Sequence, residues 1–136
     1  MNHQEVRWQQ RFQNFNKTMT HLEQALQIKN PDWLQKAGMI QLFEMSVELA
    51  WKMLKDFLEE QGFQDVKSPK ASIKKAFEIG IIAQGHEWMR LLEDRNLTVH
   101  TYDETKTDEV YQLIEKKYFP MLKELENTFK KKINEP

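Results

Sequence analysis

The feature that most constrains this sequence is a series of long apolar stripes at helical spacing, separated by very few turn-forming residues. In residues 4–28, large apolar side chains recur three or four positions apart: Trp8, Phe12, Phe15, Met19, Leu22 and Leu26. This spacing places them on one face of an amphipathic helix suited to a bundle. The chain has only 4 glycines and 4 prolines in 136 residues, too few for the turns of a many-stranded β fold.

A second, wider stripe predicts a helix over residues 31–61, with Asn30 as its N-cap, Pro31 as its first residue and Gly62 after its end. Its apolar residues, from 39 to 58, cover nearly half of the circumference. A stripe of this width must contact more than one neighbouring helix, or a second subunit. Glu44 lies at the boundary between the apolar and polar faces, where a solvated side chain is the usual outcome.

The remaining helices follow similar start and stop signals. Ser68 and Pro69 begin a short third helix that ends at Gly80. A fourth helix holds the apolar residues of 88–92, and a fifth runs from about 105 or 107 to 132, with a kink at Pro120. We therefore predict a single all-α domain over residues 1–136, an up-and-down bundle of four to five helices.

Composition excludes several kinds of chemistry. Cysteine is absent, so the chain forms no disulfide and no thiolate zinc site. His21 is expected on the surface and His86 as a cap of the fourth helix, and no histidine has the spacing of a ligand set, so we expect neither a metal nor a cofactor. No apolar run is long enough to span a membrane, and the first ten residues lack the apolar core of a signal peptide, so we expect a cytoplasmic protein.

The densest cluster of reactive side chains is RNLTVHTYDE, residues 95–104. If the fourth helix continues through it, Asn96 and His100 share one face, and Arg95 and His100 flank a groove. An imidazole can move protons near neutral pH, and a guanidinium can hold a phosphate. These groups, without a metal, are what cleavage of RNA by its own 2′-hydroxyl requires. On spacing alone, hydrogen-bond donors at a helix junction are the more common interpretation.

This segment resembles the Arg-x4-His-x-Tyr signature of HEPN domains. The matching residues are Arg95, Asn96, His100 and Tyr102. The stretch FEMSVELAWKMLK, residues 43–55, is similar to the second helix of one HEPN branch, the nucleotidyltransferase substrate-binding proteins. The resemblance covers about residues 5–130. Val99 departs from it, because this branch often has a small polar residue there.

The resemblance implies a homodimer and a role as a HepT-like toxin of a HEPN/MNT toxin–antitoxin pair. Such a toxin is a metal-independent ribonuclease whose Arg and His meet in a cleft between two subunits. Carried over, Arg95 stabilises the pentavalent phosphorane, His100 is the acid and base, and Asn96 orients one of them. Glu44 or Glu48 contributes a further polar group to the cleft.

The implied partner is a minimal nucleotidyltransferase, an antitoxin encoded nearby, which transfers AMP to Tyr102. The added charge and bulk would exclude an RNA phosphate from Arg95. The name of the branch leaves a second interpretation open, in which the chain is a non-catalytic substrate-binding or regulatory subunit of a nucleotidyltransferase.

Charge weighs against a simple RNA site. The chain has 20 basic and 21 acidic residues, and residues 86–104 hold 2 basic against 5 acidic ones. An RNA substrate would therefore need a more distant basic surface. The candidates are Lys67, Lys70, Lys74 and Lys75, or the run 130–132. Such clusters are more often solvated faces or a helix C-terminal charge bias.

Overall fold

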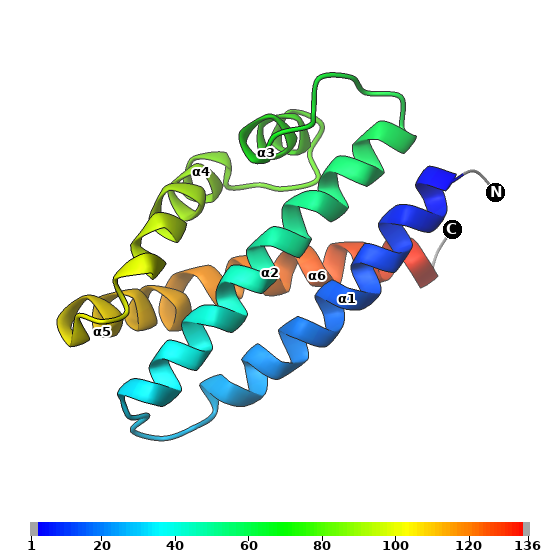
Figure 1. Ribbon diagram of the computed structural model, residues 1–136. Helices are drawn as coiled ribbons and strands as arrows, with labels where there is room; N and C mark the ends of the chain where they lie inside the picture. Colours follow the sequence, from blue (N-terminus) through cyan, green and yellow to red (C-terminus); the bar gives the residue numbers. More distant parts are fainter. Residues whose placement is uncertain (1–2, 135–136) are drawn as a thin grey trace.

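The computed structural model describes residues 3–134 and confirms the all-α fold class. Its elements are α1 (His3–Leu26), α2 (Trp33–Glu60), α3 (Pro69–Glu78), α4 (Gly85–Asp94), the 3₁₀ segment η1 (Arg95–His100), α5 (Glu104–Leu113), the π segment η2 (Ile114–Tyr118) and α6 (Phe119–Asn134). Residues 3–134 contain no strand. Helix α1 pairs with α2 along its length, and α5, η2 and α6 form one continuous rod across this pair (Figure 1).

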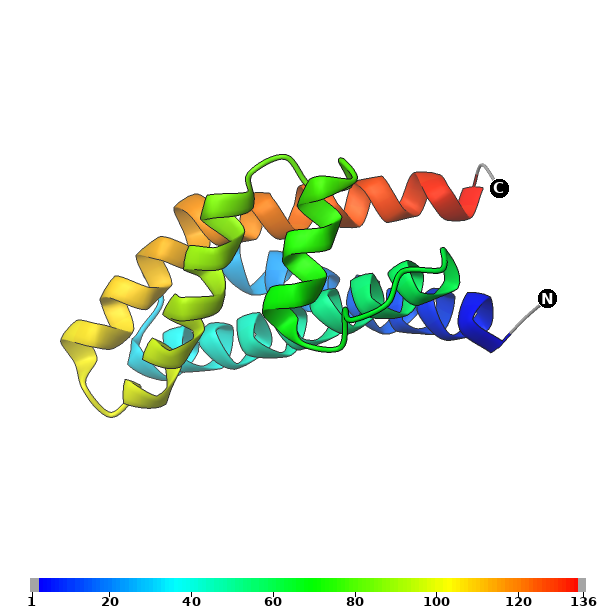
Figure 2. The same ribbon diagram turned by 90° about the horizontal axis from the view of Figure 1, so that it is seen from above.

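Helices α3 and α4 bridge the rod and α2 on one side of the molecule (Figure 2). Both ends of the described chain lie at the same end of the bundle, far from the turn between α4 and α5 (Figures 1 and 2). The signature segment follows α4 directly, so it lies at the opposite end from the termini. That end is where α2 begins.

The predicted apolar stripes form the core. Trp8 of α1, Phe57 of α2 and Phe129 of α6 make a triangle of edge-to-face contacts, with ring centroids 5.2 to 5.6 Å apart. Each such pair contributes about 0.5–1.5 kcal/mol beyond the area that it buries. The three long helices are therefore joined at the end of the bundle that carries the termini.

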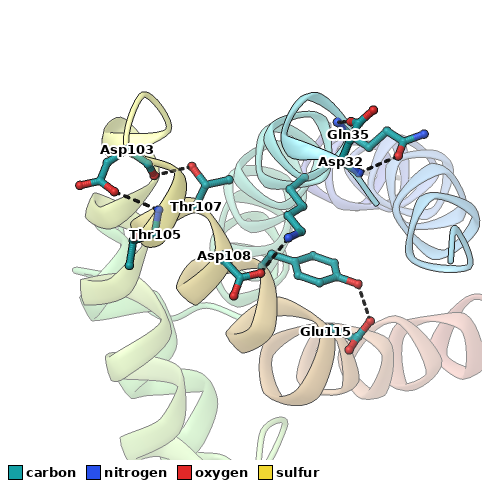
Figure 3. Close-up of polar contacts among 9 residues, drawn as sticks. Asp32, Gln35, Asp103, Thr105, Thr107, Asp108 and Glu115 are labelled. Carbon is teal, nitrogen blue, oxygen red and sulfur yellow. Dashed lines mark hydrogen bonds and ion pairs between the residues drawn. The ribbon is translucent and has the colours of Figure 1, made fainter. Parts of the chain in front are cut away.

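The structure corrects the predicted start of the second helix. Asp32, not Asn30, is the N-cap, and Pro31 precedes the cap. The Asp32 carboxylate accepts from the Gln35 N–H at 2.8 Å, and the Gln35 side chain accepts from the Asp32 N–H at 3.0 Å (Figure 3). This reciprocal capping box stabilises the helix by about 1 kcal/mol. Asn30 instead takes a left-handed turn conformation, with φ 51°.

The third helix has the predicted signals, but the fourth does not. The Ser68 hydroxyl accepts from the Ala71 N–H at 3.1 Å, Pro69 is the first residue of α3, and Gly80 follows its end with φ 84°. His86 is not the cap of α4. The cap position is Gln84, which makes no side-chain hydrogen bond to the helix. The cap prediction failed because α4 already begins at Gly85.

The predicted fifth helix contains a π turn just before Pro120. The Phe119 N–H donates to the Ile114 carbonyl, five residues back. Proline lacks an N–H, and its ring clashes with the carbonyl four residues earlier in a regular helix. The wider turn accommodates both effects. Tyr118, the last residue of the π turn, is buried, and its ring stacks on Phe43 of α2 with centroids 5.9 Å apart.

Candidate active-site groove

The α-helix α4 does not continue through the signature segment, which is a 3₁₀ helix instead. At three residues per turn, Arg95 lies over Thr98, and Asn96 lies over Val99. These four residues all line one groove, whereas His100 does not. The expectation that Asn96 and His100 share a face is therefore wrong, because it assumed α-helical geometry.

The groove is open to solvent, has a volume of about 640 Å³ and lies between α2 and η1. Its α2 side is lined by Gln41, Glu44, Met45, Glu48 and Leu49. Two of its apolar side chains are substantially exposed, Met45 at 43% and Val99 at 69%. The groove thus combines a guanidinium, two carboxamides and two carboxylates with an apolar rim that nothing in the described chain covers.

Arg95 contacts Glu48 within this groove. Its Nη1 lies 3.6 Å from the Glu48 Oε2, a loose ion pair. Glu48 also accepts from the Trp51 Nε1 at 3.1 Å and pairs with Lys52 at 3.0 Å. Partial burial alone would raise the pKa of Glu48, but these two hydrogen bonds and the charges of Lys52 and Arg95 lower it overall. Glu48 is therefore an anion at neutral pH, and its charge lies beside the guanidinium.

His100 and Tyr102 form a second group, one turn beyond the groove. The His100 Nδ1 and the Tyr102 hydroxyl are 3.1 Å apart, and the two rings meet edge to face. Tyr102 is 78% exposed, and His100 is half-buried. Within one chain, the structure brings Arg95 and Asn96 together with both glutamates, and places His100 with Tyr102.

The turn that carries His100 and Tyr102 is held by the carbonyl of Thr101. This oxygen accepts from the Trp33 Nε1 at 2.8 Å and from the Thr107 hydroxyl at 3.0 Å. The next residue but one, Asp103, caps α5 by accepting from the Thr105 N–H at 3.0 Å (Figure 3). Sequence reasoning missed Trp33. A tryptophan at the exposed start of a helix was the only available signal.

A second contact between distant residues holds the chain in place just before Arg95. The hydroxyl of the buried Tyr118 donates to the carboxylate of Asp94. Burial and this carboxylate raise the pKa of Tyr118, so the phenol remains a protonated donor. The contact ties the end of α4 to the π turn. It joins positions that are 24 residues apart, and no local pattern in the sequence reveals it.

Three further features of residues 3–134 bear on the sequence analysis. In residues 3–134, no group of three or more histidine and acidic side chains is placed to hold a metal ion. None of the helices in this part of the chain is both long and apolar enough for a membrane span. His21 is exposed on α1, as expected.

Fold and site together define an all-α bundle with an Arg-x4-His-x-Tyr segment at the edge of a polar groove. The family model described as "Nucleotidyltransferase substrate binding protein like" matches residues 10–131. The chain belongs to this family, and it is a HepT-like HEPN protein.

Known proteins agree with this placement. The chain is 34% identical to the "Probable ribonuclease HepT" of Haemophilus influenzae, in an alignment that covers 58% of this chain and 57% of that protein. It thus matches little more than half of the length of that curated relative.

Two solved structures share the fold. One, from Haemophilus influenzae, is described as revealing the fold of a substrate binding domain of a nucleotidyltransferase. It has a TM-score of 0.77 at 27% identity and covers 88% of this chain and 98% of its own. The other is a crystal structure from Thermus thermophilus, with a TM-score of 0.74 at 27% identity over 82% of this chain and 94% of its own.

Proposed function

We propose that this protein is a metal-independent ribonuclease that uses Arg95 and His100. The observation that carries the proposal is the position of Arg95 and Asn96 in an open groove, with His100 and Tyr102 on the adjoining turn. The name of the Haemophilus relative, a probable ribonuclease, supports the same activity.

The reaction needs only groups of this chain and the RNA. The His100 imidazole takes the proton of the 2′-hydroxyl, and the 2′-oxygen attacks the adjacent phosphorus. Arg95 stabilises the charge of the pentavalent phosphorane, oriented by Asn96 and Glu48. The bond to the 5′-oxygen breaks and that oxygen takes the proton from the His100 imidazolium, which leaves a 2′,3′-cyclic phosphate and a 5′-hydroxyl.

A second copy of the chain completes this site. Arg95 lines the groove and His100 does not, and this separation supports a site that takes the two groups from different protomers. The exposed Met45 and Val99 form an apolar rim that a partner subunit would cover. The homodimer places the partner's His100 across the groove from Arg95.

Regulation would act through Tyr102. Its phenol is 78% exposed, and its hydroxyl lies 3.1 Å from the His100 Nδ1. A partner minimal nucleotidyltransferase, the antitoxin of a toxin–antitoxin pair, would transfer AMP to it. The phenol oxygen attacks the α-phosphorus of ATP, and the bond to the leaving pyrophosphate breaks. The resulting phosphodiester adds a negative charge and a base beside His100 and repels RNA.

The test is cleavage of a labelled single-stranded RNA in the presence of EDTA. We expect Arg95→Ala and His100→Ala each to lower the rate by at least about 100-fold, because each removes a group that acts in the transition state. Arg90→Ala is the matched control, since Arg90 is an exposed arginine of α4 outside the groove. Intact RNA with the unmodified wild-type protein would contradict the proposal.

The alternative is a non-catalytic subunit that binds or regulates a nucleotidyltransferase. The description of the Haemophilus structure and the Glu48 carboxylate beside Arg95 favour it. It predicts a stable complex with the transferase that survives His100→Ala, together with no RNA cleavage by either component. Growth arrest on expression alone, relieved by the transferase gene, distinguishes the toxin from this subunit.

A further inference from the structure

The structure separates the candidate RNA-binding lysines from one another. Lys67 pairs with Glu59 at 3.3 Å, and Lys75 pairs with Glu78 at 2.9 Å. Lys132 lies over the ring of Phe57, 4.9 Å from its centroid, and belongs to the distant end of α6 (Figure 1). These three lysines have structural partners and lie outside the groove.

Lys70 differs from them. It is exposed on the first turn of α3 and forms no ion pair within residues 3–134. It lines a second groove of about 320 Å³ between α3 and the end of α4, together with Arg95 and Asn96. Because Arg95 and Asn96 also line the first groove, the two grooves meet at these residues. Lys70 is therefore a cation in a groove that adjoins Arg95 and that the glutamates of α2 do not line.

We propose that Lys70 binds the RNA phosphate next to the one that is cleaved. The RNA backbone then passes from the α2–η1 groove, across Arg95, into the groove between α3 and the end of α4. The groove between α3 and the end of α4 holds two cations, and cationic grooves follow the backbone of flexible single strands. The inference rests on the proposed ribonuclease function. It adds to that function a phosphate-binding subsite and a path for the RNA strand across the protein.

One acidic side chain opposes this subsite. Glu93 is exposed on α4 and lines the same groove as Lys70. Its charge repels a phosphate there, so the subsite holds two cations against one anion. Removing Lys70 and removing Glu93 should therefore shift RNA affinity in opposite directions. Loss of folding or general damage to the surface would not produce opposite signs.

The experiment measures the affinity of a fluorescent single-stranded RNA in the His100→Ala background, where the RNA stays intact. We expect Lys70→Gln to raise the Kd about 2- to 5-fold, the usual weight of one exposed ionic contact. It should also reduce the slope of log affinity against log salt by about 0.7, the value for one phosphate of a single strand. Glu93→Gln should lower the Kd, and Lys70→Arg should restore wild-type binding.

Lys17→Gln is the matched control. Lys17 is exposed on α1, and α2 lies between α1 and α3 (Figure 1). A Lys70→Gln effect equal to that of Lys17→Gln, an unchanged salt slope, or no RNA binding by the His100→Ala protein overturns the inference. Cleavage by the wild-type chain is scored separately. Cleavage that is insensitive to Lys70 overturns only the subsite, and Lys70-dependent binding without cleavage overturns only the ribonuclease.

Discussion

At the scale of single residues, the position of the His100 turn depends on one backbone oxygen. The Thr101 carbonyl accepts two hydrogen bonds, one from Trp33 at the start of α2 and one from Thr107 on α5. The 3₁₀ segment before this turn has weaker internal hydrogen bonds than an α-helix. The Trp33 donor therefore adds to the local helix a long-range contact that holds this turn.

Trp33→Phe tests this. The substitution keeps an aromatic side chain but removes the indole donor, at a cost of about 0.5–1.5 kcal/mol in the free energy of unfolding. If the ribonuclease proposal holds, we expect kcat to fall about tenfold with little change in KM, because a displaced imidazole affects the reaction more than binding. Urea unfolding and RNA cleavage measure the two effects.

Leu34→Ala is the control, since Leu34 is the next residue of α2 and is 70% exposed. Equal losses of kcat in the two variants would show that Trp33 has no special role. The same would follow from a Trp33→Phe protein that is destabilised but fully active.

The sequence predicted what depends on local pattern and missed what depends on distant partners. The stripe from Trp8 to Leu26 specified α1, because a helix buries side chains that recur at its own period. The 3₁₀ form of residues 95–100 was missed, since an α-helix and a 3₁₀ helix share the same local propensities. The hydrogen bond from Trp33 to Thr101 was also missed, because it joins residues that are 68 positions apart.

At the scale of elements, the π turn of η2 supports the signature segment from behind. Tyr118 is 1% exposed, stacks on Phe43 of α2 and donates to Asp94, the last residue of α4. One side chain thus connects three elements at the point where η1 begins. A regular helix before Pro120 would have lacked room for the proline ring.

Tyr118→Phe tests this link. It keeps the stacked ring but removes the donor to a carboxylate, and we expect a loss of about 1–3 kcal/mol in the free energy of unfolding at pH 7. Tyr102→Phe removes an exposed hydroxyl and should leave that free energy nearly unchanged. Urea unfolding of both variants, followed by circular dichroism, measures the difference.

The pH dependence gives a second measurement. The pKa of Tyr118 is raised in the folded state, so the folded protein holds this proton more tightly than the unfolded chain does. That contribution is complete below about pH 10, the ordinary pKa of tyrosine, and is lost as the pH rises above it. Wild-type protein should lose stability there more steeply than Tyr118→Phe. The Tyr118→Phe variant should still lose some stability at alkaline pH, because burial raises the pKa of Tyr111 to about 12 in the folded protein. Parallel alkaline curves would contradict the assignment.

At the scale of the whole molecule, the bundle places its termini at one end and the signature segment at the other (Figures 1 and 2). The ends of the described chain, residues 3 and 134, therefore lie away from the groove. The surface around the groove carries the apolar rim of Met45 and Val99 beside the polar groups of Arg95 and Asn96. A twofold dimer across this surface would repeat the groove twice and bring each Arg95 to the partner's His100.

Co-expression of two inactive chains tests this arrangement. In a mixed dimer of Arg95→Ala with His100→Ala, one of the two shared sites loses both groups and the other keeps both. Random pairing makes half of all dimers mixed, so shared sites predict recovery of about a quarter of wild-type activity. If each site takes both groups from one chain, every site in the mixture lacks one of them and no activity returns. Adding Val99→Lys to both chains should abolish the recovery, because a charge on the apolar rim opposes association. Light scattering of that variant at micromolar concentration should show a monomer.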